Sequence, residues 1–459
     1  MATNDQYDLL VLGSGQSGNP LAGQFSDAGK RATVVERALV AGTCINYGCT
    51  PTKTMVASAR RAYEVRSASE LGIDVSDFKV NLERIRQRKR DMVAQFRAGN
   101  ERRFESGSPE LIRGEASFVG PREIRVRLNE GGERTLSASA VVIDTGLSPL
   151  IPPIPGLDQV PYFDNVSLME LDAVPEHLII LGGGYLAVEF GQMFRRFGSE
   201  VTILQRGAHL LEHEDDDVSD GLAEILRQDG IQILTESEAD AVSGSKGKVL
   251  VRAKGGEQIE GSHVLVAVGR KPNTEALNLG AAGIKTDAHG YVQVNEKLET
   301  NVPGVYASGD VKGGPAFTHI SFDDYRILRD NLLHGADRTI KDRFVPNVVY
   351  TDPQLGRVGL TEREARAQGR PYRLAQMPMT SVARANEIGE TRGFMKALVH
   401  PDSGRILGVA VLGAEGGEIM SMVQIAMMGK LTYKELVEAI FAHPAYSESL
   451  NNLFNKLDA

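Results

Sequence analysis

The stretch YDLLVLGSGQSGNPLAGQFSDAGKRATVVER, residues 7–37, decides the fold of this chain. An apolar strand, Leu9 to Leu12, runs into the turn Gly13-Ser-Gly15-Gln-Ser-Gly18, and a segment of helical length leads to a second apolar strand. Glu36 lies at the end of that strand, 23 positions after the first glycine. Such glycines let the N–H groups at a helix start approach a pyrophosphate, and the acidic residue accepts hydrogen bonds from a ribose. The pattern predicts a βαβ unit that binds a dinucleotide.

The same pattern recurs in EHLIILGGGYLAVEFGQMFRRFGSEVTILQRG, residues 176–207. The three small positions of this copy are Gly182, Gly184 and Ala187. Gln205 stands 23 positions after the first of them, and Arg206 follows it. A carboxylate such as Glu36 suits an unmodified ribose, as in FAD, whereas a neutral side chain beside an arginine suits a 2′-phosphate. The first unit is therefore predicted to bind FAD, and the second to bind NADPH in preference to NADH.

Both cysteines of the chain lie in GTCINYGCTPTK, residues 42–53. Cys49 precedes a helical pattern, and Pro51 fits a first helical turn because no N–H is needed there. The positive end of a helix dipole favours a thiolate at such a position. The spacing of Cys44 and Cys49 alone is compatible with a structural or incidental pair. A zinc site is not expected, since the chain has no second cysteine pair to complete it.

The composition limits the classes of function. The 459 residues carry a formal net charge of −9, with 42% hydrophobic and 24% charged residues, which is typical of a globular protein of two to four domains. The basic clusters RRAYEVR and RIRQRKRD are expected to be solvated helix faces, so no nucleic-acid partner is predicted. No apolar run approaches the roughly 20 residues of a membrane span, and the polar start MATNDQYD does not resemble a signal peptide. With so few cysteines, a reducing cytoplasm is the expected location.

Further motifs give the chain a resemblance to a known family over essentially its whole length. It resembles the class I pyridine nucleotide-disulfide oxidoreductases, the family of glutathione reductase, dihydrolipoamide dehydrogenase and mercuric reductase. The motifs that carry the resemblance, besides the two glycine turns and the cysteine pair, are VVIDTGLSP (141–149), VLVAVGRKPN (264–273), TNVPGVYASGD (300–310) and YTDPQLGRVGLTEREA (350–365). Asp144 stands where an alanine is more usual. The segment GTCINYGCTPTKT is most similar to the corresponding segment of the mercuric-reductase-like branch.

The resemblance implies an α/β chain with two Rossmann-like nucleotide-binding domains, for FAD and NAD(P), and a C-terminal α+β dimerisation domain. Residues 1–150 and 274–342 are expected to form the FAD domain, and 151–273 the NAD(P) domain. The proline-rich IPPIPG, residues 151–156, marks the crossing between them. Residues 343–459 are expected to form the dimer-interface domain.

The resemblance also implies roles for single residues. Cys44 and Cys49 would form a redox disulfide, with Cys49 as the charge-transfer thiol beside the flavin and Cys44 as the interchange thiol. Lys53 would lie near flavin N5 and pair with Glu189, and Tyr185 would cover the flavin until nicotinamide displaces it. Further cofactor contacts are expected at Thr43, Gly146 and Gly269. Asp310 would reach the ribityl chain of the flavin, and Arg270 would lie near the nicotinamide cofactor. His319 would either hydrogen-bond the flavin or pack its own helix.

An acid–base pair is expected near the carboxyl end, where AIFAHPAYSESL places Glu448 five residues after His443. A histidine titrates near neutrality and can exchange a proton with Cys44, while the carboxylate orients the imidazole. The family supplies this histidine from the other subunit, which implies a homodimer.

The predicted activity is an NADPH:disulfide oxidoreductase that uses FAD. Hydride passes from NADPH to FAD, then electrons pass to the Cys44–Cys49 disulfide and on to a low-molecular-weight disulfide. Three alternatives stay open: a dihydrolipoamide dehydrogenase with NAD, a mercuric-reductase-like reduction of metal ions or quinones, and a non-enzymatic flavin redox sensor.

Overall fold

The computed structural model describes residues 4–458, and its contacts divide the chain into two compact units. The first unit holds the chain up to Thr54 with residues 87–150 and 269–343, and the second holds residues 55–86, 151–268 and the chain from Phe344 onward. Two of the changes from one unit to the other fall inside α3 (Cys49–Arg66) and α4 (Leu82–Glu101). The predicted domain limits at 150 and 342 lie close to changes of unit, but the three-domain division stays a prediction.

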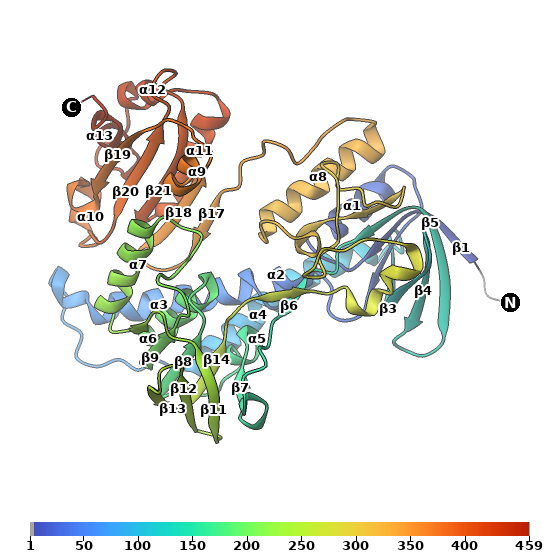
Figure 1. Ribbon diagram of the computed structural model, residues 1–459, viewed down its shortest axis with the longest axis horizontal. Coiled ribbons are helices and arrows are strands. Elements are labelled where there is room, and N and C mark those ends of the chain that lie inside the picture. The colour runs from blue at the N-terminus through green and yellow to red at the C-terminus, as the bar shows by residue number, and fades with distance from the viewer. Residues whose placement is uncertain (1–3, 459) are drawn as a thin grey trace. The chain divides into compact units, whose positions relative to one another are not determined.

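The first unit is built around one mainly parallel sheet (Figure 1). Its strands are β1 (Asn4–Leu12), β2 (Ala32–Glu36), β3 (Glu110–Gly120), β4 (Glu123–Leu128), β5 (Glu133–Ile143) and β16 (Val305–Ala307). Parallel pairing runs from β3 through β2, β1 and β5 to β16, and β4 pairs antiparallel with β3 and β5. The side chains of residues 9–12 in β1 are fully buried, because a central parallel strand is covered on both faces.

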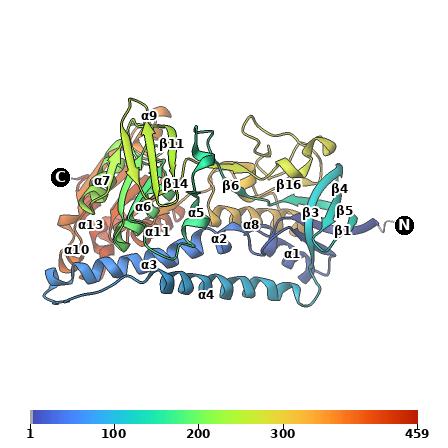
Figure 2. The same cartoon turned by 90° about the horizontal axis from the view of Figure 1, so that it is seen from below.

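Helices of the first unit cover this sheet. They include α1 (Gly18–Asp27), α2 (Gly42–Asn46) and α8 (Thr318–His334). The buried side of α1 contains Leu21, Ala22 and Phe25, the spacing of an amphipathic helix, and it packs on β1 and β2. Figures 1 and 2 both show α8 beside α1. A short antiparallel pair, β6 (Leu147–Pro149) and β15 (Arg270–Pro272), completes the unit.

The second unit contains the repeated βαβ pattern. A parallel sheet has the order β10 (Gln232–Leu234), β9 (Glu200–Leu204), β8 (His177–Leu181), β14 (His263–Val266) and β7 (Tyr162–Phe163). Helix α6 (Tyr185–Phe197) connects β8 to β9, so the second glycine turn lies between a strand and a helix as predicted. The other elements of this part are α5 (Asn165–Leu168), α7 (Asp216–Gln228) and the antiparallel strands β11 (Ala239–Ser245), β12 (Lys248–Ala253) and β13 (Gln258–Gly261).

The remainder of the second unit is an antiparallel sheet with helices. The strand order is β17 (Asn347–Val349), β18 (Gln354–Gly359), β21 (Ile406–Gly413), β20 (Phe394–Val399) and β19 (Arg373–Pro378). Its helices are α9 (Glu362–Ala367), α10 (Ala383–Glu387), α11 (Gly416–Met428), α12 (Tyr433–Glu438) and α13 (Ser449–Asn455). Helix α11 packs on β18 and β21, and α13 packs on β19 and β20. The predicted fold class, with two nucleotide-binding sheets and a C-terminal α+β part, is confirmed.

The two basic clusters are helical as expected, since they lie in α3 and α4. Their side chains are not all solvated. Lys89 is buried, and the guanidinium of Arg86 donates to the backbone carbonyl of Glu170 at 2.9 Å. Among the described residues, no helix combines the length and apolar character that crossing a membrane requires.

Candidate active site

The first glycine turn has no room for side chains at its glycine positions. Gly13 has a φ of +98°, and a Cβ there would lie 2.4 Å from the carbonyl oxygen of Asp144. A Cβ on Gly18 would lie 2.5 Å from a methyl group of Val11, so this glycine lets α1 pack closely on β1. The turn therefore has the shape that a dinucleotide-binding βαβ unit needs.

Glu36 is fixed beside the same turn at the end of β2. Its Oε2 accepts from the N–H and the hydroxyl of Ser14, at 3.0 and 2.6 Å, and its Oε1 accepts from the N–H of Ala38 at 2.8 Å. A carboxylate has about four lone-pair positions, so it keeps acceptor capacity for a ribose. Buried side-chain polar atoms of Ser17, Asn19 and Ser308 in this unit have no hydrogen-bond partner among the described residues. These features fit FAD at the first turn.

Asp144 lies at the centre of this turn. Its Oδ2 accepts from the N–H of Gly18, the first residue of α1, at 2.7 Å. Burial raises the pKa of Asp144 well above its ordinary value of 3.8, and the negative charges of Asp310, Asp324 and Glu36 raise it further, against the opposing effect of the Gly18 hydrogen bond. The residue that departs from the usual alanine is thus a buried acid among other acids.

Asp310 and Arg270 lie together in the first unit. Arg270 forms an ion pair with Asp310 at 3.3 Å and donates to the carbonyl of Leu147 at 3.0 Å. Burial raises the pKa of Asp310, while Arg270 and Lys312 act in the opposite direction. The structure therefore places Arg270, expected near the nicotinamide cofactor, against the residue expected at the flavin.

The two cysteines are in contact at the start of α3. Cys49 is the first residue of the helix, as predicted, and its sulfur lies 3.4 Å from the hydroxyl of Thr318 at the start of α8. Cys49 is exposed and Cys44 is half-buried. A hydrogen bond with Cys49 raises the pKa of the Cys44 thiol, and burial and the charge of Cys49 raise it further. The pair thus keeps its proton on Cys44 while Cys49 lies at a helix N-terminus, where a thiolate is favoured.

Other residues predicted to contact a cofactor lie in the same unit. Lys53 is one helical turn after Cys49 in α3, on the same face of the helix. Thr43 is in α2, the carbonyl of Gly146 accepts from the N–H of Asn273 at 3.0 Å, and the carbonyl of Gly269 accepts from the N–H of Leu150 at 3.0 Å. His319 is exposed in the first turn of α8, and its ring stacks on Phe317 with centroids 5.3 Å apart.

The second glycine turn is as tight as the first at its first glycine. A Cβ on Gly182, which has a φ of +105°, would lie 2.5 Å from the carbonyl oxygen of Ala267. A Cβ on Gly184 would meet no atom within 4 Å, and the side chain of Ala187 is fully buried in α6. Open space at the middle glycine fits a pyrophosphate at the N-terminus of α6.

Tyr185 and Glu189 lie one turn apart on the same face of α6. The Glu189 carboxylate is buried and accepts from the N–H of Tyr350 at 2.9 Å. The Tyr185 hydroxyl donates to Glu214 at 3.0 Å, and Glu214 forms a buried ion pair with Arg357 at 2.8 Å. Burial raises the pKa of Tyr185, and the charge of Glu214 raises it further. Glu214 and Arg357 were not predicted, because they come from distant segments with no shared local pattern.

Gln205 follows β9 and is buried. Its amide nitrogen donates to the carboxylate of Glu212 at 2.8 Å and to the backbone carbonyl of His209 at 3.2 Å. Arg206 is exposed, and the ring of His209 faces Asp220, with Nδ1 2.9 Å from the carboxylate. The sequence did not reveal that Glu212 reaches the predicted ribose-reading residue.

His443 and Glu448 form the predicted pair in the second unit. The Nδ1 atom of His443 lies 2.9 and 3.1 Å from the two carboxylate oxygens of Glu448. The His443 side chain is 68% exposed, which leaves Nε2 able to exchange a proton with another molecule. A carboxylate at Nδ1 fixes the orientation of the ring.

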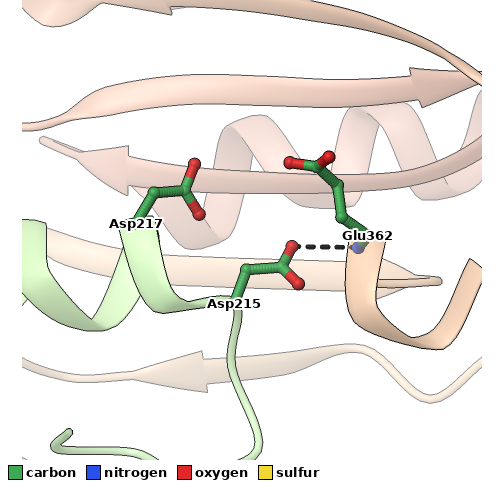
Figure 3. A group of neighbouring side chains, drawn as sticks. All are labelled: Asp215, Asp217 and Glu362. Atoms are coloured by element: carbon green, nitrogen blue, oxygen red, sulfur yellow. Dashed lines mark hydrogen bonds between the residues drawn. The ribbon is translucent and has the colours of Figure 1, made fainter. Parts of the chain in front are cut away.

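Three carboxylates lie close together in the second unit (Figure 3). Asp215 and Asp217 are at the start of α7, and Glu362 is at the start of α9. The ammonium of Lys396, 1% exposed, lies 3.0, 2.8 and 2.8 Å from their oxygens, in that order. The three carboxylates therefore surround a cation that the chain itself supplies. We call these four side chains the Lys396 cage.

The chain matches known proteins over nearly its whole length. Residues 7–324 match the pyridine nucleotide-disulphide oxidoreductase family, and residues 345–454 match the dimerisation domain of that family. The probable pyridine nucleotide-disulfide oxidoreductase RclA of Escherichia coli is 37% identical over 456 residues, which cover 98% of this chain and 99% of that protein. The mercuric reductase of Staphylococcus aureus is 35% identical over 452 residues, covering 97% of this chain and 81% of that protein.

Solved structures give the same result. The Cu(II) complex of the HOCl-induced flavoprotein disulfide reductase RclA from Escherichia coli superposes with a TM-score of 0.89 at 37% identity, covering 98% of this chain and 99% of that one. LpdA from Mycobacterium tuberculosis has a TM-score of 0.89 at 27% identity, covering 99% of this chain and 100% of that one. With both glycine turns, the cysteine pair and these matches, the chain belongs to the class I pyridine nucleotide-disulfide oxidoreductases, an enzyme family that acts on sulfur groups.

Proposed function

We propose that this enzyme reduces a low-molecular-weight disulfide with electrons from a reduced nicotinamide nucleotide. The contact between Cys44 and Cys49 at the N-terminus of α3 carries the proposal. The pair lies in the same unit as the FAD-type glycine turn. A redox sensor without turnover would not need the His443–Glu448 pair.

Each residue of the proposed site has a separate chemical role. The first glycine turn and Glu36 would hold FAD, which would supply the two-electron chemistry that links the nicotinamide nucleotide to the Cys44–Cys49 disulfide. His443 takes the proton of the Cys44 thiol, the resulting thiolate attacks one sulfur of the substrate, and the other sulfur leaves as a thiolate. His443 protonates that leaving thiolate, and Glu448 stabilises the imidazolium. Cys49 then attacks the mixed disulfide at Cys44, which releases the second thiol and restores the internal disulfide.

A homodimer belongs to this proposal. His443 would act on the cysteine pair of the partner subunit, in keeping with the match of residues 345–454 to a dimerisation domain. The exposed apolar side chains of Ile425 and Met428 on α11 support such an interface.

The nucleotide donor was predicted to be NADPH from Gln205 and Arg206. The contact between Gln205 and Glu212 weakens the basis of that prediction, because a carboxylate repels a 2′-phosphate. NADPH therefore stays a prediction from the sequence.

Reduction of a soft metal ion is the second candidate. The relatives include mercuric reductases, and a solved relative is a Cu(II) complex of RclA. Thiolates such as those of Cys44 and Cys49 are ligands that soft metal ions prefer. Dihydrolipoamide oxidation with NAD would be favoured instead by rapid lipoamide turnover.

The test is a steady-state panel of small disulfides, lipoamide, Hg(II) and Cu(II), each with NADH and with NADPH. We expect Cys44→Ser to keep its flavin and its reduction by the nucleotide, and to lose disulfide turnover by about a hundredfold or more, because no thiol remains to attack the substrate. Unchanged disulfide turnover in Cys44→Ser would reject the disulfide mechanism. Turnover of metal ions alone would favour the second candidate.

A further inference from the structure

We infer that Glu212 selects the nucleotide donor, so that the βαβ segment of the second glycine turn prefers NAD(H) to NADP(H). The inference rests on the proposed function only in taking a nicotinamide nucleotide as the ligand of this unit. The two ligands differ at one place, where the adenosine ribose carries either a 2′-hydroxyl or a 2′-phosphate. Selectivity must therefore come from the side chains at the end of β9, where the ribose is read.

The position that usually carries a ribose-binding carboxylate holds a neutral amide here, Gln205. Glu212, seven residues later in the chain, brings a carboxylate to the same place. Glu212 Oε1 accepts the Gln205 amide at 2.8 Å, and a Cβ on Gly207 would lie only 2.0 Å from the same oxygen. The carboxylate thus lies directly over Gly207, at the end of the strand.

The backbone holds Glu212 in this place. The N–H of Leu211 donates to the carbonyl of Gly183 in the second glycine turn at 2.9 Å. The guanidinium of Arg363 donates to the carbonyl of Glu212 itself at 2.7 Å. The segment that carries Glu212 is therefore fastened to the turn that would bind the pyrophosphate.

The cationic side chains near this place face acidic ones, and Arg363 forms an ion pair with Asp216 at 2.7 Å. Arg206 is the cation that led to the prediction of NADPH, but its charge also acts on Glu238, whose pKa is lowered first by Lys254 and further by Arg206. His209 is directed to Asp220. A 2′-phosphate would bring about two negative charges next to Glu212, whereas a 2′-hydroxyl can donate a hydrogen bond to the carboxylate.

The test measures the dissociation constants of NAD⁺ and NADP⁺ for the oxidised, FAD-containing enzyme by calorimetry, so that no turnover is needed. We expect NAD⁺ to bind at least about tenfold more tightly, a ratio that a single repelled phosphate readily produces. Glu212→Gln should lower the ratio at least about fivefold by improving NADP⁺ binding, and Glu212→Lys should invert it. Glu260→Gln, which removes the charge of an exposed carboxylate on β13, should leave the ratio unchanged.

Gly207→Ala provides a variant that keeps every charge. Its Cβ would displace the Glu212 carboxylate, so we expect the preference for NAD⁺ to fall as in Glu212→Gln. Tighter binding of NADP⁺ by the wild-type enzyme, or an unchanged ratio in both Glu212→Gln and Gly207→Ala, would overturn the inference. Failure of the proposed function would be distinct, since it would appear as absent disulfide turnover with either donor while the binding ratio stood.

Discussion

Asp144 is an acidic residue at a position where a small neutral residue, alanine, is more usual. Its carboxyl group is enclosed by the first glycine turn and hydrogen-bonded to the N–H of Gly18. Burial and the nearby charges of Asp310, Asp324 and Glu36 raise its pKa. The folded enzyme therefore holds a proton on Asp144 at pH values where the unfolded chain has lost it.

The raised pKa gives the sign of a pH effect. The contribution of Asp144 to stability is complete below about pH 4 and is lost as the pH rises through the raised pKa, by up to about 1.4 kcal/mol per pH unit. Asp144→Asn keeps the acceptor for Gly18 but cannot ionise. Thermal unfolding of the FAD-saturated enzyme from pH 5 to 8.5 should show this variant gaining stability relative to the wild type as pH rises. Glu130→Gln, at an exposed position, serves as the control, and a gap that stays constant with pH would count against a protonated Asp144.

Residues that leave a local signal could be predicted from the sequence. Gly13, Gly18 and Cys49 were predicted because a turn or a helix start leaves its mark on neighbouring positions. Glu212 was missed because acidic residues are common in surface loops and only the folded chain brings it to Gln205. The Glu214–Arg357 pair was missed for the same reason, since a buried ion pair between distant segments leaves no pattern in either one.

Among the elements, α1 depends most closely on its glycines. Two of them lie in different surroundings. A Cβ on Gly18 would meet Val11 at 2.5 Å and the Asp144 carboxylate at 2.9 Å, whereas a Cβ on Gly23 would meet nothing within 4 Å. The same substitution in one helix should therefore have opposite effects.

We expect Gly18→Ala to lower the free energy of unfolding by about 1–3 kcal/mol and to weaken FAD binding, because α1 must move away from β1. Gly23→Ala should raise that free energy by about 0.5–1 kcal/mol, since alanine is the better helix former and has room there. Urea unfolding and FAD titration would measure both effects. Equal destabilisation by the two substitutions would show that α1 packs differently from the structure.

The βαβ units, α3 and the C-terminal α+β part were predicted as elements because apolar strands, glycine turns and helical periodicity repeat within short windows. The extent of β1 was underestimated: residues 9–12 were expected, and the strand runs from Asn4 to Leu12. Its first residues are polar, and it is their pairing with β5 that makes them part of the strand. Pairing between distant segments is not visible in a local pattern.

The proposed homodimer can be tested through the exposed apolar side chains of α11. Ile425 and Met428 on α11 are 66% and 57% exposed in the single chain. Charged groups there would remain unpaired in an interface, so the double variant Ile425→Glu, Met428→Glu should be a monomer in light scattering. It should keep flavin reduction by the nucleotide and lose disulfide turnover by about a hundredfold or more, because no partner supplies His443.

A matched control is Ile73→Glu, at a site that is 60% exposed and lies outside the C-terminal part. It should leave the enzyme dimeric and active. A double variant on α11 that stays dimeric, or a monomer that retains full disulfide turnover, would contradict the assignment of His443 to the partner subunit.

The Lys396 cage has a consequence for how this family of sequences can change. Lys396 is 1% exposed and lies among three carboxylates, so its loss would remove the counter-charge of all three, whereas loss of one carboxylate leaves Lys396 paired with the other two. Breaking a buried ion pair from one side costs about 3–5 kcal/mol, while exchanging the whole set for apolar residues can be neutral. Substitution of Lys396 alone should therefore be rare among functional descendants of this chain, and its replacement should be accompanied by changes at residues 215, 217 or 362.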